Sequence, residues 1–206
     1  MQSPYSIAPN FYLAYKVLNS LFLGLSLGTV FKIYTPLEPI VFSIGGIALA
    51  VATMMLASQY YRILQIDYFY GISLFVEFAI LLVVILFLVF SINKHTAMAI
   101  YIGYQITFIF GSYLLRCETL LLPDTKMLTK LDLAKQTGYL AGLAVSYLFY
   151  KILTHFYDIS DSNKQIYTMH FALLVTQVLV ISSLFLAFKP NQDEIGRSLR
   201  FKKPTL

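Results

Sequence analysis

Six long apolar runs, spread over nearly the whole chain, limit how this sequence can fold more than any other feature. Three of the runs, within residues 39–61, 95–115 and 165–188, contain no Asp, Glu, Lys or Arg. A helix rises 1.5 Å per residue and needs roughly 20 apolar residues to cross a hydrocarbon core about 30 Å thick. The sequence therefore predicts an all-α polytopic integral membrane protein with six transmembrane helices, at residues 11–34, 38–59, 69–92, 97–116, 134–155 and 166–188.

Composition leaves little room for other classes of protein, because 58% of the 206 residues are hydrophobic and only 12% are charged. We expect residues 1–190 to form a single transmembrane domain and residues 191–206 to form a basic cytoplasmic tail. Residues 1–10 have neither a basic n-region nor a cleavage site, so the first span is expected to be an uncleaved anchor. The lone Cys117 excludes an internal disulfide and a cysteine-based zinc site.

The basic residues predict the orientation, since short cytoplasmic loops carry an excess of lysine and arginine. Six spans put both termini on one side of the membrane. That side would hold eleven basic residues, namely Lys16, Arg62, Arg116, Lys126, Lys130, Lys135, Lys189, Arg197, Arg200, Lys202 and Lys203. The other side would hold four, Lys32, Lys94, Lys151 and Lys164. We therefore expect both termini to be cytoplasmic, in a cell (inner) membrane, and the net charge of +5 to reflect this bias rather than a nucleic-acid partner.

Small residues recur at helical spacing in four spans, which allows the close backbone approach that holds helices together in lipid. The stripes are Ser20, Gly24 and Gly28; Ser43, Gly46, Ala50, Thr53 and Ala57; Gly103, Thr107 and Gly111; and Gly138, Gly142 and Ser146. These faces can hold a static bundle together, or they can slide during transport.

Charged residues inside the spans are costly unless they face the bundle interior or water. Glu77 lies deep in the third span, on the face of Tyr70 and Ser73, and is expected to point inward. Lys16 enters the first span from the cytoplasmic side, so its depth makes it a candidate ion-pair partner for Glu77. Four further charges converge on the same end of the bundle, and of these we expect Asp132 and Lys135 to snorkel to the headgroups. The other two, Arg116 and Glu118, close the fourth span.

Amide side chains continue inward from these charges. Asn19, Gln105 and Gln177 lie along the first, fourth and sixth spans, where an amide can bind a polar solute that has shed its water. An amide at such a position can equally bond a neighbouring helix. With Glu77, these three are the candidate substrate-binding residues.

Motifs for enzymatic chemistry are missing from the sequence, which contains no GxSxG, HExxH or GxxxxGK[ST] pattern. The histidines, His95, His155 and His170, fall at predicted external ends of spans without tight ligand spacing. We therefore expect neither an enzyme nor a bound metal or cofactor.

Two segments of the sequence resemble a known family of membrane proteins. One follows the second span, and the other is the end of the fourth span. Ala57-Ser58-Gln59-Tyr60-Tyr61-Arg62-Ile63-Leu64 lies where one six-helix half of a major facilitator superfamily transporter has the signature Gly-x-x-x-Asp-Arg-x-Gly. Arg62 matches the arginine of that signature, Asp67 is a displaced substitute for its aspartate, and both glycines are absent. Glycines in the first span, Arg116-Cys117-Glu118 after the fourth and a long loop before Gly138 add to the likeness.

The resemblance implies a half-transporter of two inverted three-helix repeats. It also implies that Arg62 and Asp67 belong with Lys16, Arg116 and Glu118 to a charge network that gates the cytoplasmic end. Because the family places two halves around its solute site, this chain is expected to act as a homodimer that carries an unidentified small solute, with Glu77 available for proton coupling. The alternative is a non-transporting membrane scaffold or assembly partner whose polar residues only lock the helices together.

Overall fold

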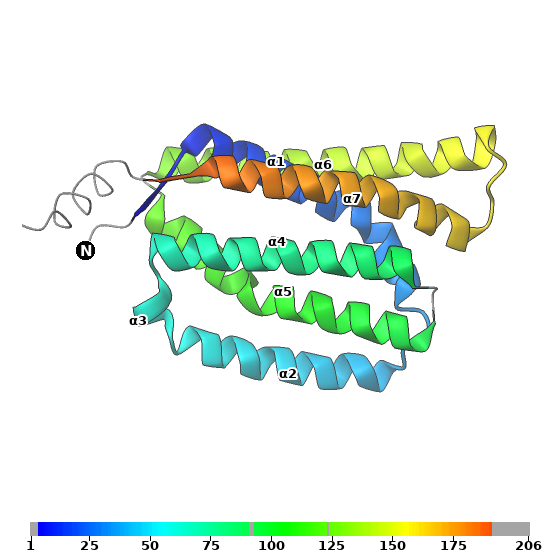
Figure 1. Ribbon diagram of the computed structural model, residues 1–206, viewed down its shortest axis with the longest axis horizontal. Coiled ribbons are helices and arrows are strands. Elements are labelled where there is room, and N and C mark those ends of the chain that lie inside the picture. The colour runs from blue at the N-terminus through cyan, green and yellow to red at the C-terminus, as the bar shows by residue number, and fades with distance from the viewer. Residues whose placement is uncertain (1–3, 91–92, 123, 191–206) are drawn as a thin grey trace, which may run out of the picture.

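The computed structural model describes residues 4–90, 93–122 and 124–190, and the expected basic tail at residues 191–206 lies outside them. The described chain is a bundle of helices that run alternately up and down, with a short ribbon at one end (Figure 1). Its elements are β1 (Tyr5–Ile7), α1 (Pro9–Ile33), α2 (Pro39–Ala57), α3 (Tyr60–Ile63), α4 (Ile66–Val89), α5 (Lys94–Leu121), α6 (Thr125–Phe156), α7 (Ser162–Ala187) and β2 (Phe188–Pro190).

Local sequence determines where these helices begin. Pro9 and Pro39 occupy the first position of α1 and α2, where the missing N–H costs nothing and the fixed φ angle suits a helix. The side chains of Asn93, Asp124 and Asp161 cap α5, α6 and α7 by accepting hydrogen bonds from backbone N–H groups of their first turns.

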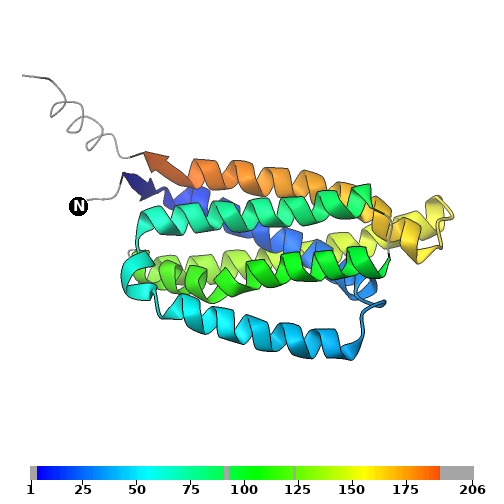
Figure 2. The ribbon, with the colours of Figure 1, turned by 60° about the horizontal axis from the view of Figure 1, so that its bottom comes forward.

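The long helices pack side by side in the order α6, α1, α7, α4, α5, α2 (Figures 1 and 2). Helix α1 contacts both α6 and α7, α4 contacts both α7 and α5, and α2 packs on α5. The short helix α3 lies at the end of the bundle that also carries β1 and β2. The two termini of the described chain are therefore at the same end.

Helices α1 and α6 approach closely through their small residues, as the stripes predict. A Cβ atom at Gly142 would lie 2.9 Å from Gly24 Cα, and one at Gly24 would lie 2.8 Å from the backbone nitrogen of Leu143. A Cβ at Gly138 would lie 3.0 Å from the carbonyl carbon of Val17. These two helices thus touch backbone to backbone at positions where the glycines leave no room for a Cβ atom.

Helix α2 does not use its predicted packing stripe. No residue of α2 is buried, and Ser43, Gly46, Ala50 and Ala57 are exposed. The helix instead contacts α5 through its opposite side, where Gly45 lies against the ring of Tyr101 and Val41 packs nearby. The stripe did not predict the packing face of α2, because small residues also occur on the exposed surface of a helix.

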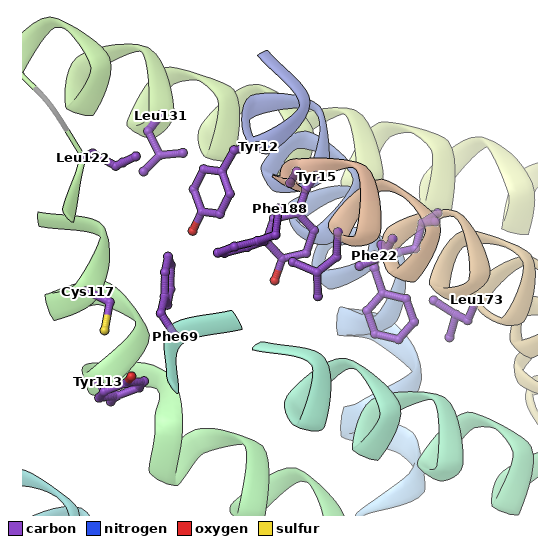
Figure 3. Packing of buried hydrophobic residues seen from close by; sticks show 14 of the residues in the cluster. Tyr12, Tyr15, Phe22, Phe69, Tyr113, Cys117, Leu122, Leu131, Leu173 and Phe188 are labelled. Atoms are coloured by element: carbon purple, nitrogen blue, oxygen red, sulfur yellow. The ribbon is translucent and has the colours of Figure 1, made fainter. Parts of the chain in front are cut away.

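The ends of the bundle are joined in two ways. At the end near the termini, β1 pairs antiparallel with β2. Phe188 packs against Tyr12 and Phe69 (Figure 3) and stacks on Tyr70. At the opposite end, Lys94 donates a 2.6 Å hydrogen bond to Glu38, which lowers the pKa of that exposed carboxyl.

Five helices have the length and apolar composition needed to cross a membrane, namely α1, α2, α4, α5 and α7. They coincide with five of the six predicted spans, so an all-α multi-pass membrane protein is the class that the structure supports. The sixth predicted span, residues 134–155, lies within the 32-residue α6, which is not among these five.

Candidate functional site

A polar face on the first half of α1 organises the candidate site. Tyr12, Tyr15, Lys16 and Asn19 are spaced three and four residues apart, which places them on one side of a helix. Tyr12, Tyr15 and Lys16 are buried, so their polar groups need partners inside the bundle. Figure 3 shows Tyr12 and Tyr15 projecting from α1 into the bundle interior. Their partners form two adjacent clusters.

The Glu77 cluster, which comprises Glu77, Tyr15, Asn19 and Gln177, lies near the middle of α4, α1 and α7. Glu77 is 1% exposed. Its Oε1 accepts hydrogen bonds from the Tyr15 hydroxyl at 2.6 Å and from Asn19 Nδ2 at 2.9 Å. Gln177 Nε2 donates to Glu77 Oε2 at 2.8 Å. One carboxyl group therefore ties three helices together.

The amide of Gln177 contacts Glu77 at two points. Its nitrogen also donates to the backbone oxygen of Glu77 at 2.9 Å, so it faces two acceptors and must carry the hydrogens. Asn19 likewise offers only donors at its nitrogen. The three partners thus all donate to this carboxyl group. The other amide atom, Gln177 Oε1, is buried and receives no hydrogen bond from the described residues.

The Glu118 cluster, which comprises Glu118, Tyr12, Lys16 and Lys135, lies toward the end of the bundle that carries the termini. Glu118 is 2% exposed and forms ion pairs with Lys16 through Oε1 and with Lys135 through Oε2, the latter at 2.5 Å. The Tyr12 hydroxyl donates to Oε1 at 2.9 Å. Helices α1, α5 and α6 thus meet at one carboxylate, and the two ammonium groups share its charge.

Two predictions about these charges were wrong. Lys16 pairs with Glu118, and among the described residues Glu77 takes part in no ion pair. Lys135 does not snorkel away but turns to Glu118, with its side chain 24% exposed and Asp132 at 3.7 Å on its outer side. Depth along a helix is readable from sequence, whereas the direction in which a side chain points depends on how the helices are rotated.

A groove of about 410 Å³ lies between α1 and α6, beside both clusters. Its walls are Lys16, Asn19, Ser20, Leu23, Lys135, Gln136 and Tyr139. The groove therefore reaches one residue of the Glu77 cluster and two of the Glu118 cluster. A solute bound there would contact groups that hold five helices together.

The remaining predicted site residues lie outside the two clusters. Gln105 is on α5, and its Oε1 is buried without a hydrogen-bond partner among the described residues. Arg62 is exposed on α3, with its guanidinium 5.1 Å from the ring centre of Tyr61. Asp67 is half-buried in the first turn of α4, and Arg116 is exposed near the end of α5. Within the predicted charge network, Glu118 is the residue that forms an ion pair with Lys16.

The histidines do not assemble a metal site within the part of the chain that the structure describes. His95 and His155 are exposed, whereas His170 is buried and stacks on Phe87 with ring centres 3.6 Å apart. A second cavity, of about 700 Å³, lies at the end of the bundle opposite the termini, where α4 ends and α7 begins. Its walls are largely apolar and include one charged residue, Lys164.

Sequence reasoning missed Tyr12 and Tyr15, which donate to the two carboxylates. Tyr12 lies near a predicted span end, where tyrosine is typical of the membrane–water interface. The sequence pattern that could have revealed them is the face shared by four polar residues on an otherwise apolar helix. This pattern appears only when the four residues are considered together.

Comparison with known proteins identifies no relative, since no family model, curated protein or solved structure matches this chain.

Proposed function

We propose that this protein is a half-size membrane transporter for a small solute, acts as a homodimer, and couples transport to protons through Glu77. The observation that carries the proposal is the position of Glu77. It is a carboxyl group near the middle of an apolar helix, held by neutral donors from two other helices. Ionisable groups at such depth are rare and typically mark solute or proton pathways.

Protonation of Glu77 would change its contacts in a defined way. A protonated carboxyl oxygen can donate, and a neutral carboxyl group accepts more weakly than an ionised one. The Tyr15 hydroxyl can reverse its role, and the buried Gln177 Oε1 is a further acceptor in the same cluster. Uptake of one proton therefore weakens the hydrogen bonds that join α1, α4 and α7, and this weakening is the link to conformation that a proton-coupled carrier needs.

We include α6 as a sixth span. It packs along α1 through Gly138 and Gly142, and a short segment joins it to α7, which is itself apolar enough to cross a membrane. Helices α1 and α7 run in opposite directions, so the number of spans from α1 to α7 must be even. The five apolar helices therefore need α6 as the sixth span. Six spans also place both termini on one side.

The pattern of helix contacts supports two inverted repeats, as in one half of a major facilitator superfamily transporter. Exchanging α1 with α5, α2 with α6 and α4 with α7 turns the α1–α6 contact into the α5–α2 contact and the α1–α7 contact into the α5–α4 contact. The α4–α7 contact is unchanged by this exchange. The main packing contacts among the long helices thus fit a repeat of three plus three.

Labelling from outside the cell tests the orientation and the sixth span together. With the buried Cys117 left in place, Ser160→Cys in the segment between α6 and α7 should react with a membrane-impermeant maleimide on intact cells. Lys126→Cys, at the other end of α6, should react only after permeabilisation. Labelling of both residues under the same condition would show that α6 does not cross.

Transport by reconstituted protein tests the role of Glu77. Proteoliposomes carrying a mixture of labelled small metabolites outside should accumulate one class of solute faster when a proton gradient points inward. We expect Glu77→Gln to reduce that uptake to the rate without a gradient, because the glutamine cannot exchange a proton. Glu38→Gln, a matched change at an exposed carboxyl, should keep the stimulation.

The homodimer is supported by the surface position of the α1–α6 groove. Two lysines and two amides are unfavourable against hydrocarbon, and a second copy packed over α1 and α6 would shield them. Liposomes that contain wild-type and Glu77→Gln chains mixed in known ratios provide the measurement. If both copies must be intact, stimulated uptake should follow the square of the wild-type fraction, whereas independent monomers would give a straight line.

The scaffold alternative is favoured by a different observation, namely that each carboxylate oxygen of Glu77 and Glu118 already has a partner. Carboxylates whose oxygens all have partners are suited to holding the helices in one fixed arrangement. Failure of every solute to accumulate above protein-free liposomes, with a folded protein, would support this alternative.

A further inference from the structure

The groove between α1 and α6 has an unusual distribution of charge. Lys16 and Lys135 both line it, and none of the described residues that line it is acidic. The carboxylate that neutralises them, Glu118, lies behind them and is 2% exposed. A solute in the groove therefore meets two ammonium groups that share Glu118, while the exposed Asp132 lies 3.7 Å from Lys135 on its outer side.

The other walls suit a small polar molecule. Asn19, Ser20, Gln136 and Tyr139 offer amide and hydroxyl groups, and Leu23 is the apolar contact. The volume of about 410 Å³ falls within the range of roughly 300 to 1,000 Å³ that is typical of small-molecule sites. Lys16 is 7% exposed, so its charge is held largely out of solvent, where an interaction with an anion is stronger.

Glu118 indicates which anion fits. One of its oxygens faces the Lys16 ammonium and the other faces Lys135, so the two lysines are already spaced for the two oxygens of a carboxylate. An incoming carboxylate can therefore replace Glu118 at Lys135, the more exposed lysine, without a new arrangement of the groove.

From this geometry we infer that the groove binds a small organic carboxylate, which competes with Glu118 for Lys135 and Lys16. The inference rests on the proposed function and names the class of its solute. Because the Lys135–Glu118 ion pair joins α6 to α5, an anion that takes Lys135 also releases that link. Asn19 extends the effect to Glu77, whose carboxylate it bonds. Solute binding and the proton site are thus connected through one helix face.

Binding can be measured without any assay of transport. The full chain would be placed in nanodiscs of zwitterionic lipid, and its melting temperature followed with acetate, lactate or succinate against chloride and inorganic phosphate at equal ionic strength. A ligand that binds the folded state raises the melting temperature with concentration. We expect a saturable rise with at least one carboxylate, and smaller rises with chloride and phosphate.

Two substitutions with opposite expected effects make the test specific. Lys135→Met should weaken carboxylate binding by about tenfold or more, since one charge-assisted hydrogen bond is lost. Glu118→Gln should strengthen it, because the competing carboxylate is gone. The matched control is Lys130→Met, an exposed lysine on the same helix, which should bind as the wild type does. If Glu118→Gln does not fold, the comparison of Lys135→Met with Lys130→Met decides alone.

Several outcomes would overturn the inference: no saturable rise with any carboxylate, equal rises in Lys135→Met and Lys130→Met, or a larger rise with phosphate that depends on Lys135. The first two would remove the site, and the last would change its ligand class. Carboxylate binding without solute flux in liposomes would refute the proposed transport but leave the site intact. Proton-driven uptake of a solute that is not an anion would leave transport intact and refute the site.

Discussion

Replacing Gly142 with isoleucine should sharply reduce the yield of folded protein. A Cβ atom at this position would lie 2.9 Å from Gly24 Cα and 3.0 Å from the backbone nitrogen of Leu25. These are backbone atoms of α1, so they cannot turn aside as a side chain would. Overpacking typically costs about 1 to 3 kcal/mol, and we expect a loss at or above the upper end of that range.

Size-exclusion chromatography of a fluorescent fusion in mild detergent gives the folded yield directly. Gly46→Ile is the matched control, since no atom lies within 4 Å of a Cβ at Gly46 and its helix α2 is exposed there. We expect a monodisperse peak for Gly46→Ile and an aggregated profile for Gly142→Ile. Equal profiles would mean that α1 and α6 do not pack as the structure describes.

Most of the helical architecture could be predicted from sequence because membrane-spanning helices are long, apolar and separated by short polar segments. The predicted and observed helices agree along the chain, apart from α3, which is a single short turn of four residues. The ends differ most for α6, which begins at Thr125 rather than at residue 134. Its first turns carry Lys126, Lys130 and Asp132, so a search for apolar runs cannot include them.

The choice of helix neighbours could not be predicted in the same way. The stripes of α1 and α6 do face each other, but the stripe of α2 faces outward. Small residues permit close approach without specifying a partner. What distinguishes Gly142 from Gly46 is the helix that lies opposite, and a single sequence contains no direct record of that contact.

The polar site shows a similar division. Asn19, Glu77, Gln105 and Gln177 were predicted to line one solute site. Glu77 contacts Asn19 and Gln177, whereas Gln105 lies outside that cluster. The partner of Lys16 was predicted wrongly, because Glu77 and Glu118 both lie within reach of the first span by depth alone. The rotation of α1 decides between them, since Tyr15 and Asn19 point to one carboxylate while Tyr12 and Lys16 point to the other.

The ion pair between Lys16 and Glu118 should be visible as a coupling energy. Removing one member of a buried pair costs about 3 to 5 kcal/mol, since the other charge is left without a partner. We expect Glu118→Gln to approach that cost, because it strands two lysines. Lys16→Met should cost less, since Glu118 keeps Lys135 and Tyr12. The free energy of unfolding in mixed micelles would be measured for each variant.

The double variant should lose clearly less stability than the sum of the two single variants. Contacting pairs typically differ from additivity by about 0.5 to 3 kcal/mol, and we expect a value in the upper half of that range. A second cycle, between Lys16→Met and Glu77→Gln, should give a smaller coupling, because Tyr15 and Asn19 rather than Lys16 contact Glu77. A larger coupling in the second cycle would return Lys16 to Glu77 and would remove the shared carboxylate on which the groove depends.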